Sequence, residues 1–220
     1  MLTTTSRCSE YDHPEFRITH DELIPNDDVE WLASVLVRSV SEGSRFSGGE
    51  LIDLGSMLLR LRRSGQLIDL QEPLLGQVPI RWQVGVSNSL RLLRLQKDVA
   101  ASVGQLERIE FAKLRSWILV GVDVDPFADS FLLERVEHVE SDSGWFVGLP
   151  DSRIDYGNAD SLRRISVFEA ISDWPRVAGF LALPTGSRVE IGKTKCVISY
   201  LDETLTPEKG SLLDEASTFQ

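Results

Sequence analysis

Hydrophobic residues recur at helical spacing in two stretches of the chain. From Asp27 to Ser41, apolar side chains return every three or four residues, and Gly43 follows the stretch. A second apolar stripe runs from Ser87 to about Val103 and ends at a glycine. This spacing is typical of an amphipathic helix, and glycine commonly ends one. Helices are therefore predicted over both ranges, the first with Asp27 and Glu30 spaced like a capping pair.

The other ordered stretches show alternating or short continuous apolar patterns, which indicate half-buried and fully buried strands. A helix over Met57–Arg63 remains an alternative, because that run is short. Gly192 and Lys193 are expected to join the last two strands as a hairpin. A short helical stretch opens with a capping-box spacing at Ser166 and is expected to break at Pro175. The predicted strands are FRIT, ELIDLG, MLLRLRR, LIDLQEP, IRWQVGV, SWILVGV, FLLERVEHVE, GWFVGLP, SRVEI and KCVISYL.

Strands outnumber helices and do not alternate regularly with them. This favours an α+β fold with antiparallel sheets and a few packed helices over a doubly wound parallel sheet. A subdomain boundary is expected near Glu107–Arg115, where the second helix has ended and a new set of strands begins. The predicted organisation is a disordered tail at 1–15, an α+β domain at 16–108, a second α+β domain at 109–205 and a flexible tail at 206–220.

The amino-acid composition limits the kinds of partner that the protein is expected to bind. The 220-residue chain has a formal net charge of −11, which disfavours sequence-independent binding to nucleic acid or to an anionic membrane. It shows no apolar run long enough to span a bilayer and no secretory signal, so a cytoplasmic protein is expected. The excess of acidic residues is concentrated between Asp123 and Asp160, a segment that contains ten acidic residues and two arginines. That segment suits a protein partner with a basic face.

Several patterns resemble functional motifs without meeting their requirements. A Gly-Lys-Thr at 192–194 has five rather than four residues between its glycines and no helix after it, so a β-hairpin is favoured over a phosphate loop. Asp123, Asp125, Asp129 and Glu134 fit an EF-hand spacing, but Phe127 and Ala128 occupy the positions that need an oxygen ligand and a glycine. A solvated acidic loop is therefore favoured over bound calcium. We expect neither metal nor cofactor.

Catalysis is not expected either. The histidines fall in no triad or metal-ligand spacing, and GVSNS fails the nucleophile-elbow pattern at its last position. A basic helical face at Arg91, Arg94 and Lys97 could contact phosphates, although solvated or ion-paired side chains are the more common role. Cys8 is placed in the tail, and Cys196 is read as a small core residue. The histidines concerned are His13, His20 and His138.

The segment from Asp142 to Ser187 carries the most distinctive order of motifs. DSGWF at 142–146 is followed by an acidic loop with Asn158, a short helix at 167–171 and an L-x-x-P-x-G-S segment ending at Ser187. This order resembles a family of bacterial immunity proteins, the thirty-third family in the polymorphic-toxin naming scheme. The resemblance covers the C-terminal half, and its shortened acidic stretch and apolar run before the proline depart from the family pattern.

The resemblance implies a non-catalytic protein that binds and neutralises a cognate bacterial toxin. The alternative is an accessory or regulatory ligand-binding protein with no toxin partner. The family motif is expected to act mainly as a determinant of the fold, through Asp142, Ser143, Gly144, Trp145, Pro184 and Gly186. Toxin contact is expected from acids in predicted loops, namely Asp123, Asp125, Asp129, Asp151, Asp155 and Asp160.

Overall fold

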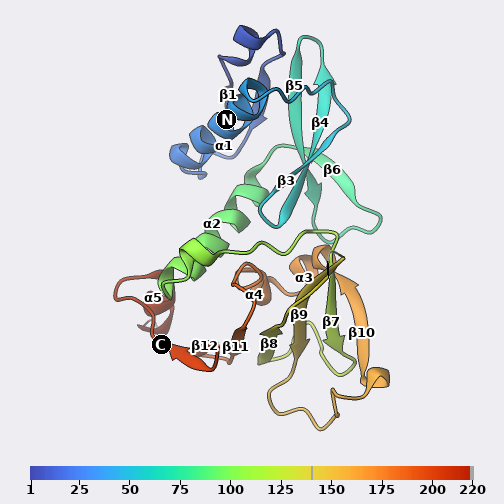
Figure 1. Cartoon of the computed structure of the whole chain (residues 1–220), viewed down its shortest axis with the longest axis vertical. Coiled ribbons are helices and arrows are strands. Elements are labelled where there is room, and N and C mark those ends of the chain that lie inside the picture. The colour runs from blue at the N-terminus through green and yellow to red at the C-terminus, as the bar shows by residue number, and fades with distance from the viewer. Residues whose placement is uncertain (140, 219–220) are drawn as a thin grey trace. The chain divides into compact units, whose positions relative to one another are not determined.

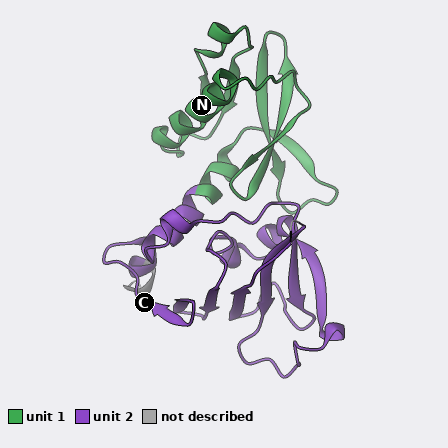
Figure 2. Ribbon diagram, viewed as in Figure 1, with its two compact units in different colours: residues 1–93 green, residues 94–220 purple. Residues whose placement is uncertain are grey.

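The computed structural model describes residues 1–139 and 141–218. It divides into two compact units, residues 1–93 and 94–220 (Figure 2). Each unit contains its own mixed or mostly antiparallel sheet together with helices, which confirms the predicted α+β fold (Figure 1). The boundary lies inside helix α2, Ser87–Ser102, and therefore earlier than the sequence predicted. The first turn of α2 is bonded within the first unit, whereas its later residues pack within the second.

The sheet of the first unit has the strand order β1-β2-β5-β4-β3, with β6 also paired to β5. The long strands β4 and β5 form an antiparallel hairpin, and β2 lies parallel to β5. MLLRLRR is a strand, so the helical alternative is wrong for this segment. The strand bounds are β1, Leu2–Thr4; β2, Phe16–Thr19; β3, Leu51–Leu54; β4, Met57–Ser64; β5, Leu67–Leu74; and β6, Arg81–Val84.

Helix α1, Asn26–Ser41, supplies the apolar layer that covers one face of this sheet. Its buried face is the stripe predicted from spacing, namely Val29, Leu32, Leu36 and Val40. Pro25 holds the N-cap position and no side chain caps the helix, so the expected Asp27–Glu30 capping pair is wrong. The sheet residues on the same side, among them Phe16, Leu61 and Leu70, are at most 1% exposed.

The first fifteen residues do not form the disordered tail that their polar sequence suggested. β1 pairs antiparallel with β2, and the 3-10 helix η1, Cys8–Tyr11, follows it. Cys8 is fully buried, and burial raises the pKa of its thiol to about 11. His13 is buried as well, and it accepts a hydrogen bond from the backbone N–H of Phe46. Long-range pairing orders this segment, and local composition does not report such pairing.

The sheet of the second unit has the order β10-β7-β9-β8-β11-β12-β13. All neighbours are antiparallel except β7 and β9, which run parallel. β11 and β12 form the hairpin expected around Gly192 and Lys193. The bounds are β7, Trp117–Gly121; β8, Phe131–Arg135; β9, Asp142–Gly148; β10, Leu162–Ser166; β11, Ser187–Ile191; β12, Cys196–Tyr200; and β13, Glu203–Leu205.

Short helices pack beside this sheet. α3, Val167–Asp173, opens with the predicted capping box, in which Ser166 and Glu169 each accept a backbone N–H. α4, Pro175–Ala178, begins at the proline where a break was expected. Residues 212–218 form α5, so the C-terminal stretch is not simply a flexible tail. η2, Leu106–Arg108, and η3, Ala159–Ser161, complete the described helices. No described helix has the length and apolarity needed to cross a membrane.

Candidate functional site

The topology of the second sheet gathers the predicted acidic residues at one end. The parallel strands β7 and β9 both finish there, at Gly121 and Gly148, and their antiparallel neighbours β8 and β10 both start there. The connecting loops, residues 122–130 and 149–161, therefore leave the same edge of the sheet (Figure 1). We call these two loops the acidic end. They carry Asp123, Asp125, Asp129, Asp151, Asp155 and Asp160 against a single basic residue, Arg153.

Tyr156 anchors the longer loop onto the end of the sheet. Its ring lies against Gly121 and Gly148, where an added Cβ would come within 2.4 and 2.8 Å of ring carbons. The Tyr156 hydroxyl donates to Asp123 Oδ1 at 2.8 Å and accepts the N–H of Leu149 at 3.0 Å. Burial and the Asp123 carboxylate raise the pKa of the hydroxyl, which keeps it protonated as a donor. A side chain at position 121 or 148 would collide with the Tyr156 ring. Glycine at both positions therefore lets the longer loop lie directly on the end of the sheet.

The six acids differ in how much of their charge remains available. Asp123 is half-buried and accepts hydrogen bonds on both oxygens, from Tyr156 and from Ser152 at 2.7 Å. Asp129 forms an ion pair with Lys193 at 2.7 Å. Asp123 therefore acts as a structural support, and the charge of Asp129 is offset. The remaining four carboxylates are exposed and form no ion pair among the described residues, namely those of Asp125, Asp151, Asp155 and Asp160.

Phe127 stands at the tip of the shorter loop with 93% of its surface exposed. The tip is a turn held by Asp125, whose Oδ1 accepts the N–H of Phe127 at 2.7 Å and whose carbonyl accepts the N–H of Ala128 at 3.0 Å. In the longer loop, Asp155 and Asn158 make equivalent side-chain-to-backbone bonds. These local bonds fix the loops, which lowers the conformational entropy lost on binding. Sequence reasoning named the acids of these loops but gave no role to the exposed side chain of Phe127.

The DSGW segment lies in β9, and its residues are structural. Trp145 is 1% exposed and its indole N–H donates to the carbonyl of Leu181 at 3.1 Å. Gly144 has a φ of +75°, and an added Cβ would lie 2.3 Å from the carbonyl oxygen of Val136. Ser143 donates to the carbonyl of Trp117 at 2.6 Å, and Asp142 accepts the N–H of Gly144 at 2.9 Å. Each residue of the motif therefore satisfies a backbone group or permits a close approach.

Arg135 connects this motif with the Pro184–Ser187 turn, and sequence reasoning missed it. Its guanidinium is buried and donates to the carbonyls of Ser143 at 3.1 Å and Leu183 at 2.6 Å, and also to that of Glu110. Its Nη2 lies 3.3 Å from the Glu110 carboxylate. Burial lowers the pKa of Arg135, and the Glu110 charge opposes this effect. The sequence did contain a signal for the burial of Arg135, because this residue follows the buried Phe131 and Leu133 in the alternating pattern of β8.

The turn itself agrees with the prediction for its proline and glycine. The N–H of Ser187 donates to the carbonyl of Pro184 at 3.1 Å, and Gly186 has a φ of +92°. Beside the turn, a pocket of about 540 Å³ is lined by Glu110, Arg135, His138 and Asp142 among others. Arg135 already donates to the carbonyls of Glu110, Ser143 and Leu183. The charged groups of this pocket therefore serve to join the backbone segments that carry these carbonyls.

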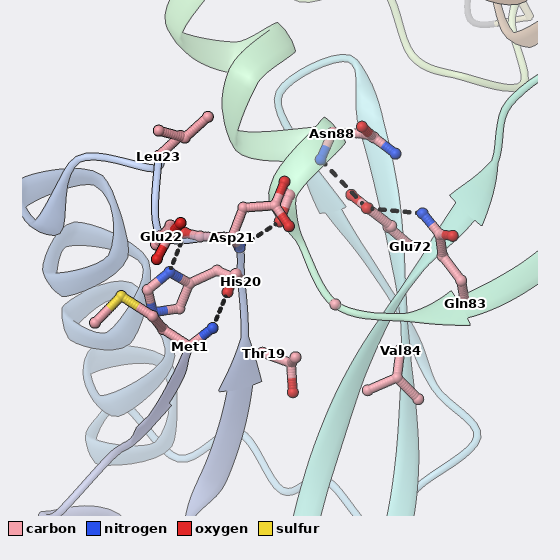
Figure 3. A pocket seen from close by; sticks show the side chains of 12 residues that line it. Met1, Thr19, His20, Asp21, Glu22, Leu23, Glu72, Gln83, Val84 and Asn88 are labelled. Atoms are coloured by element: carbon pink, nitrogen blue, oxygen red, sulfur yellow. Dashed lines mark hydrogen bonds between the residues drawn. The ribbon is translucent and has the colours of Figure 1, made fainter.

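The first unit contains a polar pocket of about 640 Å³ between the end of β2 and the start of α2 (Figure 3). Glu72 lies at its base, 2% exposed, and accepts hydrogen bonds from Gln83 and from the N–H groups of Asn88 and Ser89. It therefore satisfies the N-terminal donors of α2. Asp21 in the rim is ion-paired with Arg91. Both carboxylates are used within the fold, which leaves the exposed Glu22 as the acceptor in the lining for a ligand.

Other sequence-level candidates are also resolved by the fold. Glu134 of the calcium-like spacing lies in β8 and pairs with Arg188, away from the loop acids. Among the described residues, no group of histidine, cysteine or carboxylate side chains is arranged to hold a metal ion. Arg91 of the basic helical face is paired with Asp21. Glu140, one of the ten acids counted in the acidic segment, lies outside the described residues.

Comparisons with known proteins find no relative of this chain. No family model matches the chain, and neither a curated protein nor a solved structure is significantly similar to it. The resemblance of residues 142–187 to immunity proteins therefore stays a prediction.

Proposed function

We propose that this chain is a non-catalytic binding protein that docks a protein partner on its acidic end. The observation that carries the proposal is the combination, on two fixed loops, of four exposed carboxylates and the 93% exposed Phe127. An exposed aromatic residue supplies apolar area to be buried, and the surrounding charges steer the encounter and select the partner. A basic groove containing an apolar recess is the complementary surface.

The partner proposed is a bacterial toxin, and the chain would act as its cytoplasmic immunity protein. Support for the toxin comes from the order of the DSGW, Asn-loop and L-x-x-P-x-G-S motifs. In the fold, the first and last of these motifs are joined through Arg135 and Trp145. The motifs therefore build the scaffold, and the acidic loops would present the contact surface. Many toxins that act on nucleic acids need a basic substrate groove, which an acidic protein surface can block.

The test is binding between the purified chain and the product of the adjacent gene, measured by calorimetry and size exclusion. We expect a 1:1 complex whose association rate falls as salt is raised. The double variant Asp151→Lys/Asp160→Lys should weaken the complex by about 100-fold or more, since two attractive charges become repulsive at exposed positions whose side chains do not hold the loop turns. Phe127→Ala should weaken it mainly through faster dissociation, by about tenfold or more.

The matched control is Glu203→Lys. Glu203 is exposed and opens β13, opposite Tyr200 at the far end of the β11–β12 pair from the Gly192 turn. It should bind the partner as the unsubstituted chain does. Loss of binding in this control as well would indicate a general charge effect and not a defined surface. Absence of any complex with the adjacent gene product at low salt would refute the toxin proposal.

A ligand-binding role is the second candidate, favoured by the pocket in the first unit. Its lining includes Asp21, Glu22 and Glu72, so a cationic ligand such as a polyamine is the class to test. A thermal-shift screen with polyamines, nucleotides and divalent metals separates the two functions. A shift with one of these ligands, removed by Glu22→Gln, would favour this second role.

A further inference from the structure

The sheet of the first unit has one face on which arginine and tryptophan side chains from different strands meet. Arg60 of β4 lies directly opposite Leu51 of β3 and Gln71 of β5, and Gln71 lies opposite Val84 of β6. Residues directly opposite each other point to the same side of a sheet. Arg62, two positions along β4, and Trp82, two positions along β6, share that side. We call Leu51, Arg60, Arg62, Trp82 and Val84 the arginine face.

The arginine face is the exposed side of the sheet. The alternate residues of β4 and β5, such as Leu61 and Leu70, point the other way and are at most 1% exposed. On the arginine face, Arg62 is exposed, and the two apolar residues Leu51 and Val84 are 41% and 50% exposed. Apolar area that remains open beside fixed charges is a feature of interaction surfaces.

Arg60 is held in place without losing its charge. Its Nε and Nη2 both donate to Gln71 Oε1, at 2.9 and 2.7 Å, and its guanidinium lies 4.9 Å from the centre of the Trp82 ring. Gln71 is only 3% exposed, so it supports Arg60 from beneath. An amide fixes the guanidinium but does not neutralise it. The cation stays available for an anionic partner and is already ordered before binding.

The neighbouring Arg17 shows the contrasting arrangement. Arg17 donates to both oxygens of Asp69, at 2.6 and 2.9 Å, and the resulting ion pair is neutral overall. Asp69 lies opposite Arg62 in the β4–β5 register, but it is 6% exposed and committed to Arg17. Arg60 and Arg62 form no ion pair among the described residues. The exposed Asp53 of β3, two positions from Leu51, shares this side of the sheet, so three arginines stand against two aspartates and the face keeps a net positive charge.

We propose that the arginine face is a second docking surface, and that its occupant is an acidic segment of a partner protein. Arg60 and Arg62 are suited to accept carboxylates in bidentate geometry. Tryptophan and arginine are also the residue types that contribute most to protein interfaces. Leu51 and Val84 would be covered by apolar side chains between the acids. This surface is distinct in chemistry from the acidic end of the second unit.

A protein segment fits this face better than a nucleic acid does. The first unit has nine arginines and no lysine against thirteen acidic residues, so its net charge is negative and repels a dense polyanion more strongly than a peptide with a few spaced carboxylates. The face has a single aromatic residue, and Arg60 already covers one side of its ring. Single-stranded nucleic acid binding needs several open stacking platforms in a positive groove. A peptide with spaced carboxylates and apolar side chains can contact both the arginines and the exposed apolar residues of this surface.

The experiment measures fluorescence anisotropy of a labelled peptide in which glutamate alternates with leucine, added to the full chain. The same titration is run with labelled oligothymidylate, and sedimentation of the chain alone reports self-association. We expect the peptide to bind, and Arg62→Glu and Arg60→Met each to weaken binding about tenfold or more. Arg38→Glu is the matched control, because Arg38 is exposed on α1, which packs against the other face of the sheet.

Each remaining outcome would overturn the proposal. Absence of peptide binding, or equal binding by Arg62→Glu and the unsubstituted chain, would remove the face as a docking surface. Tighter binding of oligothymidylate that is lost in Arg62→Glu would make it a nucleic-acid surface. Self-association that Arg62→Glu abolishes would make a second copy of the chain the occupant. Because the exposed Arg62 side chain makes no hydrogen bond among the described residues, this variant keeps the test independent of folding.

Discussion

Gly144 offers a direct test of the packing that holds the DSGW strand in place. Substitution by alanine forces a side chain into a left-handed backbone conformation, with φ of +75°, and places its Cβ 2.3 Å from the oxygen of Val136. Gly104 provides the control within the same unit. Its φ is +68°, but nothing lies within 4 Å of the position that a Cβ would take. The two substitutions therefore impose the same backbone strain and differ in the collision.

The expected magnitudes follow from these geometries. The left-handed conformation costs about 1–2 kcal/mol for a residue with a Cβ, at either position. At Gly144 the Val136 oxygen must also move by about 1 Å to reach ordinary contact, and such overpacking costs about 1–3 kcal/mol. The movement further strains the bond from Val136 N–H to the Gly144 carbonyl, 3.0 Å long. Gly144→Ala should lose about 2–5 kcal/mol of unfolding free energy, and Gly104→Ala about 1–2 kcal/mol.

Urea unfolding of both variants measures the difference. Fluorescence of the five tryptophans, among them Trp145 buried beside Gly144, and far-ultraviolet circular dichroism give two probes of the unfolding of the chain. With a urea dependence of about 2 kcal/mol per molar, the two midpoints should differ by about 1 M. Equal midpoints for Gly144→Ala and Gly104→Ala would refute the reasoning, because backbone strain alone would then account for both losses.

Further predictions concern the groups around this scaffold and the acidic end. Arg135→Met should cost about 3–5 kcal/mol in urea unfolding, since it leaves buried carbonyls and the Glu110 carboxylate without their partner. Burial raises the pKa of Glu110, but hydrogen bonds from Thr185 and the charge of Arg135 outweigh it and lower the pKa below 4.5. This carboxylate therefore stabilises the fold above about pH 4.5 and loses that contribution as the pH falls through its folded pKa, so the stability difference from Glu110→Gln should shrink in acid. Tyr156→Phe should speed amide exchange across loop 149–161 while leaving the free energy of unfolding within about 1–2 kcal/mol of that of the unsubstituted chain. Burial raises the thiol pKa values of Cys8 and Cys196 to about 11 and 12, so neither should react with a thiol reagent near neutral pH until the chain is unfolded.

Local sequence patterns were sufficient to predict much of the fold. The helical stripe at 27–41, the alternating strand at 57–63, the capping box at Ser166 and the break at Pro175 all depend on neighbours in sequence. The N-terminal segment was misjudged because its order comes from pairing of β1 with β2 and from burial of Cys8. Pairing between distant segments leaves no periodicity in a short polar stretch.

The sequence by itself determined the fold class, the acidic composition of two loops and the structural role of Trp145 and Gly144. Only the tertiary structure decided which acids remain available, because the partners of Asp123 and Asp129 come from other loops. The inward position of Arg135 could have been read from its alternation, but its carbonyl partners could not. The meeting of Arg60 with Trp82 likewise depends on strand register. Periodicity records which way a side chain points, whereas the neighbours that it meets are set by how distant strands pair.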